Sequence, residues 1–375
     1  MDYRLSRFTV RGFKTIRELK DFEPGALTVL IGPNGSGKTN FISFFRLLSW
    51  ALSPPGNLQT YVAELGGATS ILHDGPAKTR EVEAQLVIDT NDGTNEYSFR
   101  LFHAAGDTLI FAEEAFSFRR PGQPRWPGPT RPGPGLGAGH KEAKLIAEAE
   151  SGNPTAKFIL NMLRRIIVHQ FHNTSFTSRM RNKWNKDDGR WLKEDAGNLA
   201  PFLYRLQNDE PQYYRRIVET IRLVLPFFAD FEFEPEYDWL LLRWKERGSD
   251  QIFNASQAAD GMLRIIALIA LLQQPERDLP GVLVLDEPEL GLHPYAIEVL
   301  AALIQSASKH VQVIVATQSV SLIDRCEPED IVVTDRAHRE SSYRRLSATE
   351  LSDWLERYTL SELWEKNVLG GRPSR

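Results

Sequence analysis

The sequence predicts an α/β fold with a mixed sheet flanked by helices, to which an antiparallel β sub-lobe and a helical insertion are added. The short apolar segment 281–285 has the character of a buried strand, and a predicted helix over 295–309 leads to a second buried strand over 311–316. A third apolar segment, 27–31, leads through a glycine-rich loop into a predicted helix over 38–52. These alternating strands and helices indicate the α/β class.

The N-terminal part contains further strands outside this core. Leu5–Val10 alternates between apolar and polar residues. Glu81–Ile88 and Glu96–Phe102 have the pattern of a β-hairpin, with Thr90-Asn91-Asp92-Gly93 at the turn. Residues 119–140 are rich in proline and glycine, and they predict an exposed, flexible loop.

Helical patterns dominate the middle of the chain, from Lys141 to about Leu225. Two segments, 231–233 and 239–244, then predict strands, and 261–273 predicts a strongly apolar helix. We therefore divide the chain into an N-terminal lobe with the glycine-rich loop and the β sub-lobe (1–118), a Pro/Gly-rich loop (119–140), a helical insertion (141–225) and a C-terminal lobe (226–375).

Composition narrows the class of protein. The 375 residues include 45 Lys and Arg and 49 Asp and Glu, and the net charge of −4 argues against a uniformly basic nucleic-acid coat, though not against a local basic patch. Cys326 is the single cysteine, so an intrachain disulfide is excluded and a reducing compartment fits. The sequence has no signal-peptide pattern and no apolar run long enough to span a membrane. We expect a cytoplasmic protein without a membrane partner.

The glycine-rich loop carries the strongest motif. Gly32-Pro33-Asn34-Gly35-Ser36-Gly37-Lys38-Thr39 matches the pattern G-x-x-x-x-G-K-S/T in full. Its glycines let successive backbone N–H groups turn toward phosphates, and the following helix adds its N-terminal dipole. We expect Lys38 to reach the β- and γ-phosphates and the Thr39 hydroxyl to ligate Mg²⁺. A glycine-rich turn that matches by chance is the alternative, and the strand before and helix after the loop argue against it.

An acidic pair follows the buried strand 281–285. Asp286 is placed to help hold Mg²⁺, and Glu287 is placed to polarise the attacking water as a general base. The alternative is an exposed acidic turn after a core strand. Far more chain separates Lys38 from Asp286 than a compact nucleotide-binding core needs, which predicts a large insertion between the two halves of the site.

Further motifs resemble those of ATP-binding-cassette (ABC-type) ATPases of the RecF, SMC and OLD group, most closely its stand-alone bacterial AAA-family members. The opening V-R-G-F-K-T-I-R-E-L and the loop G-P-N-G-S-G-K-T-N, which ends at Asn40, are similar to the first lobe of that family. Residues 286–294 (D-E-P-E-L-G-L-H-P) resemble its Walker B motif and D-loop. Ala316-Thr317-Gln318-Ser319 resembles its switch segment, with Gln318 where transporters carry histidine. F-H-N-T-S at 171–175 and the ending L-S-E-L-W-E-K-N-V-L-G-G-R-P resemble one subgroup.

The resemblance implies an ABC-type head that uses ATP and Mg²⁺ and hydrolyses ATP to ADP and phosphate. The residues that it assigns are Lys38, Glu287 and Gln318 for catalysis, Gly32 to Asn40 with Asp260 and Gly261 for nucleotide binding, and Thr39 and Asp286 for Mg²⁺.

The family signature motif aligns with Ala258–Arg264 (A-A-D-G-M-L-R) at a helix start. We expect Asp260 to cap this helix and the N–H groups near Gly261 to face outward, toward the γ-phosphate held by an opposite subunit. Ala259 replaces the usual serine and offers no hydroxyl to the phosphate, although Ser256 lies near enough in sequence to substitute. The replacement argues against fast hydrolysis rather than against binding. A plain buried helix is the alternative.

The resemblance also implies partners. A head-to-tail homodimer would hold two ATP molecules, with binding closing a clamp and hydrolysis opening it. Relatives act on DNA, in genome maintenance or in antiviral defence, often with a separate effector such as a TOPRIM-like nuclease. A nucleotide-gated switch with little hydrolysis and a transporter subunit are the other functions that we weigh; Ala259 favours the switch, and Gln318 argues against the transporter.

Several weaker sequence features each allow more than one interpretation. Gln170 and Gln59 are both candidates for the family's Q-loop, or are ordinary polar residues. His169 and His172 have the spacing of a metal pair but lack a third ligand nearby. Basic residues with interleaved tryptophans at 179–193 suit nucleic-acid contacts or a solvated charged face. The loop that carries Arg119, Arg120, Arg125 and Arg131 is either a contact site for DNA, RNA or a partner protein or a flexible linker.

Overall fold

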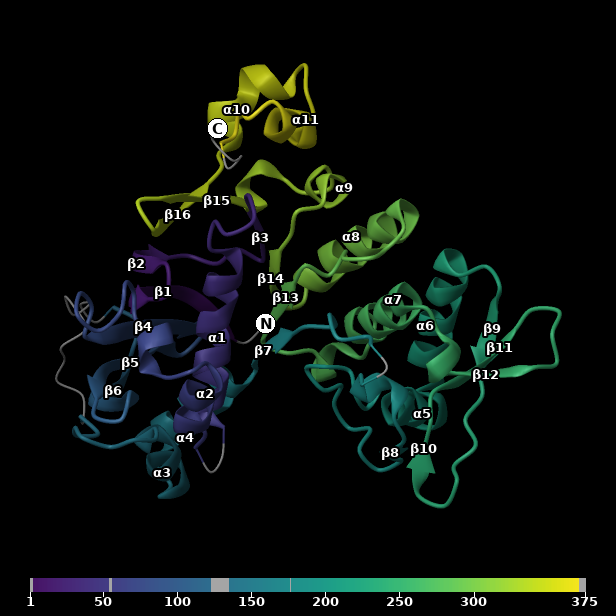
Figure 1. Ribbon diagram of the computed structural model, residues 1–375, viewed down its shortest axis with the longest axis horizontal. Helices are drawn as coiled ribbons and strands as arrows, with labels where there is room; N and C mark the ends of the chain where they lie inside the picture. Colours follow the sequence, from purple (N-terminus) through teal and green to yellow (C-terminus); the bar gives the residue numbers. More distant parts are fainter. Residues whose placement is uncertain (1–2, 54–55, 123–134, 176, 371–375) are drawn as a thin grey trace.

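A computed structural model describes residues 3–53, 56–122, 135–175 and 177–370. Its centre is a six-stranded sheet (Figure 1). In spatial order the strands are β16 (Glu340–Arg345), β15 (Ile331–Ala337), β3 (Leu27–Ile31), β14 (Gln312–Ala316), β13 (Val282–Asp286) and β7 (Ile166–His169). Only β16 is antiparallel to its neighbour, so the sheet is mixed, as predicted.

The parallel register brings several loops to one edge of this sheet. Asp286 pairs with Ala316, Leu285 with His169, and Ala316 with Leu30. The carboxyl ends of β3, β7, β13 and β14 therefore lie side by side, although they come from residues far apart in the chain. In open α/β sheets this edge is where ligands bind.

A second, antiparallel sheet forms the other face of the N-terminal lobe. Its strands, in spatial order, are β2 (Ile16–Phe22), β1 (Tyr3–Phe13), β4 (Glu81–Thr90), β5 (Gly93–Ala104) and β6 (Thr108–Arg119). Thr90 pairs with Gly93, which confirms the predicted hairpin turn. The sequence patterns identified neither β2 nor β6, which are the two edge strands.

Helix α1 (Lys38–Leu52) joins the two sheets through its phenylalanines. Phe8 on β1 contacts the rings of Phe41, Phe44 and Phe45. The same buried cluster includes Leu30 of the central sheet. Because apolar residues occupy opposite sides of α1, the helix after the glycine-rich loop is anchored on both sides. Three further helices complete this lobe: α2 (Leu58–Glu64), α3 (Lys144–Glu150) and α4 (Pro154–Arg164).

The chain between β7 and β13 forms a separate arm, on the right of Figure 1. Its elements are β8 (Trp184–Asn185), α5 (Leu199–Asp209), α6 (Pro211–Val224), β9 (Phe228–Phe231), β10 (Trp239–Leu240), β11 (Arg243–Glu246), β12 (Ile252–Asn254) and α7 (Asp260–Leu272). The strand predicted at 231–233 is therefore shifted to Phe228–Phe231, and the one predicted at 239–244 is divided by residues 241–242, which belong to no strand. Residues 144–164, which we expected in the insertion, bury their apolar side chains with the N-terminal lobe.

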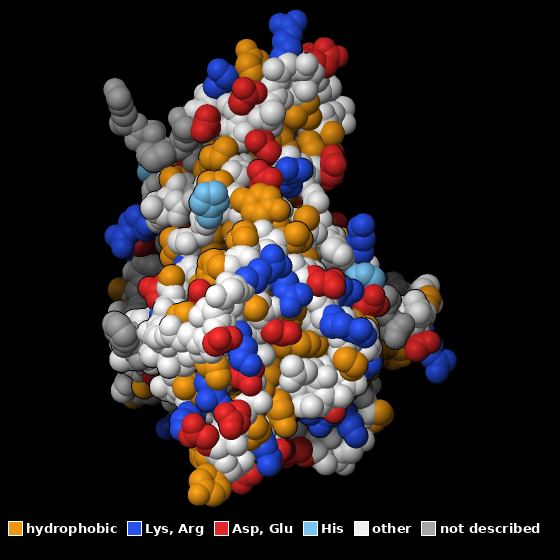
Figure 2. Space-filling model, turned by 90° about the vertical axis from the view of Figure 1, so that its right-hand side faces the viewer, with side chains coloured by type: hydrophobic (Ala, Val, Ile, Leu, Met, Phe, Trp, Pro, Cys, Tyr) orange, Lys and Arg blue, Asp and Glu red, His pale blue; other side chains and the backbone are white. Residues whose placement is uncertain are grey.

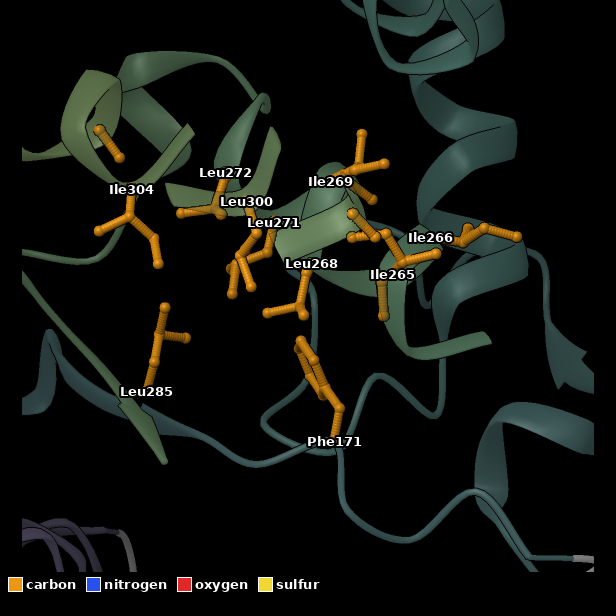
Figure 3. Packing of buried hydrophobic residues seen from close by; sticks show 14 of the residues in the cluster. Phe171, Ile265, Ile266, Leu268, Ile269, Leu271, Leu272, Leu285, Leu300 and Ile304 are labelled. Carbon is orange, nitrogen blue, oxygen red and sulfur yellow. The ribbon is translucent and has the colours of Figure 1, made fainter. Parts of the chain in front are cut away.

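Helix α7 connects this arm to the central sheet. Figure 3 shows Phe171, from the segment after β7, pointing toward Leu268 on α7. Leu285 of β13 and Leu300 of α8 (Pro294–Ser308) belong to the same buried cluster. A displacement of α7 would therefore also displace the segments that follow β7 and β13, because packed interiors transmit displacements.

The last part of the chain extends the central sheet and covers one end of it. Helices α9 (Val320–Ile323), α10 (Ala348–Leu355) and α11 (Leu360–Glu365) lie at the top of Figure 1. Asp324 accepts hydrogen bonds from the backbone N–H and hydroxyl of Ser361 (2.9 and 2.6 Å), which holds α11 to the end of α9. Within the described residues, no helix has the length and apolar character that a membrane crossing needs.

Candidate nucleotide-binding site

The loop between β3 and α1 has the backbone that its glycines were expected to permit. Gly32, Gly35 and Gly37 have positive φ angles of 153°, 80° and 116°. Gly37 is the residue before α1, and its carbonyl accepts the first helical hydrogen bond, from Phe41 N (2.9 Å). At Gly32 a Cβ atom would lie 2.2 Å from the Thr334 carbonyl oxygen, so no side chain fits there.

Lys38 lies along this loop. Its Nζ donates to the carbonyl oxygens of Gly32 (2.6 Å) and Pro33 (3.1 Å). Burial lowers the pKa of Lys38, and the carboxylates of Glu287 and Asp286 oppose that shift. Lys38 thus holds its ammonium over the loop, close to the acidic pair. Thr39 is exposed at the helix start.

The C-terminal hairpin β15–β16 supports the loop from behind. Ser341 Oγ donates to the Ser36 carbonyl (2.6 Å), and Tyr343 Oη donates to the Gly37 carbonyl (3.1 Å). Thr15 Oγ1 lies 2.7 Å from Ser341 Oγ and accepts from Asn40 Nδ2 (2.8 Å). These contacts join residues about 300 positions apart, and no short-range sequence pattern marks them.

Asp286 ends β13 with a nearly fully buried side chain. Its Oδ2 accepts from Gln170 Nε2 (3.2 Å), whereas Oδ1 is buried without a hydrogen-bond partner in the part of the chain that the structure describes. Burial raises the pKa of Asp286, and the Arg46 guanidinium opposes that shift. An orphaned carboxylate oxygen is costly in a protein interior unless a ligand satisfies it.

Glu287 has a strained backbone and a held side chain. Its φ angle is +42°, a left-handed conformation that costs a non-glycine residue about 1 kcal/mol or more. Its N–H donates to the Ala316 carbonyl (2.8 Å), and Gln318 Nε2 donates to its Oε1 (2.5 Å). The end of β13 and the segment after β14 therefore aim the Glu287 carboxylate together.

Glu289 is a site residue whose role the sequence patterns did not assign. Its Oε1 accepts from Thr317 Oγ1 (2.6 Å) and from Gln318 N (2.9 Å), and burial raises its pKa. Glu289 holds the Thr317 hydroxyl and the Gln318 backbone N–H, and it thereby positions the Gln318 side chain. It acts through Gln318 and is a positioning residue.

The two glutamines that the sequence left open lie in different places. Gln170 follows β7, where it binds Asp286 and accepts a hydrogen bond from Arg46. Gln59 on α2 donates instead to the carbonyls of Leu109 and Lys141 (both 2.8 Å), in the N-terminal lobe. Position therefore favours Gln170 over Gln59 as the Q-loop residue.

The start of α7 differs in one respect from the expectation. Ala259 occupies the capping position and Asp260 is the first helical residue, so the prediction that Asp260 caps the helix is wrong. Asp260 instead accepts from Arg181 (2.9 Å). Ala259 is exposed, and Ser256 Oγ donates to Asn254 Oδ1 (2.5 Å). The Ser256 hydroxyl is thus used locally rather than offered in place of the missing serine.

Two residues of α7 fit it closely to neighbouring loops. A Cβ at Gly261 would lie 2.7 Å from the Gly291 carbonyl oxygen, so glycine is required for this contact with the D-loop. Arg264 donates to the carbonyls of Phe171 (2.9 Å) and His172 (3.3 Å). The helix is therefore tied to the segment that carries Gln170, while its first turn lies on the arm, away from α1 (Figure 1).

Comparisons with known proteins agree with this geometry. Residues 27–324 match the family model described as an AAA domain, putative AbiEii toxin, Type IV TA system. The chain belongs to this AAA family. An SMC head bound to the C-winged helix domain of ScpA is similar in fold, with 15% identity, a TM-score of 0.60 and coverage of 93% of this chain and 99% of that chain. The Pyrococcus furiosus SMC head with an extended coiled coil, bound to the C-terminal domain of ScpA, has 14% identity, a TM-score of 0.59 and coverage of 94% and 99%. No curated protein matches.

The chain therefore has the α/β fold of an SMC ATPase head, as the sequence predicted. Such ATPases generally use Mg²⁺ with the nucleotide. The residues present fit that ion, because the buried Oδ1 of Asp286 lacks a partner within the described chain and carboxylate and hydroxyl oxygens are the ligands that Mg²⁺ prefers.

The two histidines beside the candidate site have different surroundings. His172 directs Nε2 at the Asp286 carbonyl oxygen (2.8 Å) and Nδ1 at Gln170 Nε2 (2.9 Å). His169, three residues earlier on β7, is buried against Phe171. Burial lowers the pKa of His169 to about 4, and the Lys193 backbone opposes that shift.

This buried histidine makes stability depend on pH. The folded pKa of His169 lies below the unfolded value of about 6.5, so the unfolded chain binds more protons as pH falls through that window. We expect the free energy of unfolding to fall by about 2–3 kcal/mol more between pH 7 and pH 4.5 in the wild type than in His169→Leu. Urea denaturation of both proteins at the two pH values measures the difference; equal losses would show that His169 does not titrate in this window.

Opposite charges accompany the basic residues of the arm. The pairs are Arg179–Asp195 (3.1 Å), Arg181–Asp260 (2.9 Å), Lys183–Glu236, Lys186–Asp238 (2.9 Å) and Lys193–Asp188 (3.1 Å). Figure 2 shows basic and acidic side chains intermixed on the face that it presents. Trp184 lies under the Arg179 guanidinium, whereas Trp191 is half-exposed. Arg125 and Arg131 lie outside the described residues.

Proposed function

We propose that this ABC-type head binds ATP with Mg²⁺ and hydrolyses it as an ATP-driven dimer clamp in DNA-related processes, genome maintenance or antiviral defence, together with a separate effector protein. The observation that carries the catalytic part is the pairing of Glu287 with Gln318 beside the orphaned oxygen of Asp286. A carboxylate held by an amide next to a metal-binding carboxylate is the arrangement that water activation needs.

Each group then has a role. The backbone N–H groups of Gly32–Gly37 and the dipole of α1 bind the β- and γ-phosphates, with Asn40 at the helix start. Lys38 exchanges its two carbonyl partners for phosphate oxygens. Thr39 and Asp286 would hold Mg²⁺, which when bound neutralises charge on the phosphates. Glu287 accepts a proton from the attacking water, and Gln318 keeps its carboxylate in line.

A second copy of the chain would complete the site. The first turn of α7, with Ala259, Asp260 and Gly261, carries the family's phosphate-contacting motif but lies on the arm, away from α1. In a head-to-tail dimer this turn would face the γ-phosphate bound by the other copy. ATP would then favour the closed dimer, because these contacts exist only there.

The proposals of an effector protein and of a DNA-related role rest on similarity to other proteins. The matching family includes a putative toxin of a type IV toxin–antitoxin system in its description, and the two similar SMC heads are bound to ScpA domains. We propose that this head likewise works through a separately encoded protein, of which a TOPRIM-like nuclease is one candidate.

The second candidate function is a nucleotide-gated switch with little hydrolysis. Ala259 supports it, since the position that usually offers a hydroxyl is exposed but has none, and the Ser256 hydroxyl is engaged with Asn254. Glu287 argues for turnover, because a pure switch does not need a base.

The first test is ATP binding and turnover by the purified chain, with and without duplex DNA. We expect Lys38→Ala to abolish turnover and to weaken binding of a fluorescent ATP analogue by at least about tenfold, because it removes the cation nearest the phosphates. Stimulation of wild-type turnover by DNA would support the DNA-related role. Equal nucleotide affinity in wild type and Lys38→Ala would count against the proposed phosphate site.

A further inference from the structure

Arg46 is a positively charged residue on the side of the proposed ATP site where Mg²⁺ is expected. None of the sequence motifs accounts for it. It lies on α1, two turns after Lys38, with its side chain 28% exposed. Its Nη2 is 3.8 Å from Asp286 Oδ2, and the same nitrogen donates to Gln170 Oε1. One guanidinium therefore contacts two of the oxygens that border the position expected for Mg²⁺.

These contacts engage two of the side-chain oxygens that a free metal ion would use, and of the Asp286 carboxylate they leave Oδ1 open. The amide oxygen is the only side-chain atom of Gln170 that can ligate a hard cation, and Arg46 donates a hydrogen bond to it. Asp286 has a positive charge beside Oδ2 and a hydrogen bond from Gln170 on the same oxygen. A divalent ion that entered alone would meet the Arg46 charge at close range, where the buried surroundings screen repulsion poorly.

We propose that Arg46 is a built-in counter-ion of Asp286 that opposes divalent metal binding until nucleotide arrives. This inference rests on the proposed ATP site. The triphosphate brings negative charge to the same place, which offsets the repulsion between Arg46 and the metal and gives the guanidinium another anion to contact. Metal and nucleotide then bind together, and the nucleotide-free head does not hold the metal.

A structural role would give the opposite result. If Arg46 only holds Gln170 and Asp286 in the geometry that the metal needs, removing it should weaken metal binding. If it is a competing counter-ion, removing its charge should strengthen metal binding in the absence of nucleotide. The sign of the change therefore separates the two.

The experiment is a titration of the nucleotide-free protein with Mn²⁺, followed by electron paramagnetic resonance of the free ion. We expect Arg46→Gln and Arg46→Met to bind Mn²⁺ at least about tenfold more tightly than the wild type, because both remove the charge. Arg46→Lys, which keeps the charge, should remain close to the wild type. Asp286→Asn should bind no Mn²⁺ at this site, and circular dichroism melts identify the variants that are folded.

Two results would overturn the inference. One is tight Mn²⁺ binding by the nucleotide-free wild type, which needs no variant to detect. The other is equal or weaker binding by the folded neutral variants. A fluorescent ATP analogue distinguishes these from failure of the proposed function: if the wild type does not bind the analogue, the ATP site itself is wrong, whereas normal analogue binding with unchanged Mn²⁺ affinity removes only the role of Arg46.

Discussion

Glu287→Gln is expected to lower ATP turnover by roughly 10²–10⁴-fold while ATP binding is retained. Glutamine has the same shape, so its amide oxygen can still accept from Gln318 Nε2, which now lies 2.5 Å from Oε1. The left-handed φ of +42° is no less tolerable for glutamine than for glutamate. The substitution thus removes the proton acceptor and leaves the geometry, and steady-state phosphate release measures its effect.

The same variant also tests the clamp. If hydrolysis opens the dimer, Glu287→Gln should accumulate as a dimer in ATP, which light scattering during gel filtration would detect. Glu289→Gln is the matched control, because it makes the same chemical change two residues away on a positioning residue, and we expect a smaller loss of turnover. Wild-type turnover by Glu287→Gln would place the base elsewhere. A wild type that binds ATP but turns over no faster than the variant would favour the nucleotide-gated switch.

Local patterns in the sequence were sufficient for the core of this site. The apolar run 27–31, the glycine loop and the helix 38–52 were predicted with the bounds that the structure has, because a short buried strand, a phosphate loop and an amphipathic helix each leave a signal within a few residues. The strand predicted at 281–285 is present one residue later, at Val282–Asp286. Such elements are determined by their own residues and need no distant partner to be recognised.

Contacts made across the fold left no comparable signal. Ser341 supports the phosphate loop from the C-terminal hairpin, and Arg46 binds Gln170 and Asp286 from the far side of α1. Each depends on the order of strands in the central sheet, which periodicity does not reveal. An arginine within the largely apolar run F-I-S-F-F-R-L-L was the one local sign that could have drawn attention to Arg46.

Competition between neighbours explains the error at the signature helix. Aspartate is a common helix-capping residue. Arg181, however, donates a hydrogen bond to the Asp260 carboxylate and another to the Ala258 carbonyl (3.0 Å). The ion pair fixes Asp260 as the first helical residue, and Ala259 takes the capping position without a side-chain hydrogen bond. The edge strands β2 and β6 escaped prediction for a related reason, since edge strands carry polar residues that blur the alternation.

Gly37→Ala is expected to impair the phosphate loop strongly through a single added methyl group. At Gly37 a Cβ would lie 2.1 Å from Ser341 Oγ and 2.7 Å from Ser341 Cβ, on a backbone with φ of 116°. The left-handed conformation costs alanine about 1–2 kcal/mol, and overpacking of this kind costs about 1–3 kcal/mol more. Either the hairpin β15–β16 or the loop must move, and a shift of about 1 Å in a binding loop weakens function roughly 10²-fold.

Gly35→Ala is the matched control, because its φ of 80° is also left-handed but a Cβ there meets no atom within 4 Å. It carries the conformational cost alone, so we expect a loss of about 1 kcal/mol in the free energy of unfolding and a smaller loss of affinity. Thermal melts and titration with a fluorescent ATP analogue compare the two variants. If Gly37→Ala and Gly35→Ala behave alike, the loop tolerates a displaced hairpin and Ser341 does not shape it. If Gly37→Ala alone loses the nucleotide, and adding Ser341→Gly restores part of the affinity, then the phosphate loop depends on a contact from the opposite end of the chain.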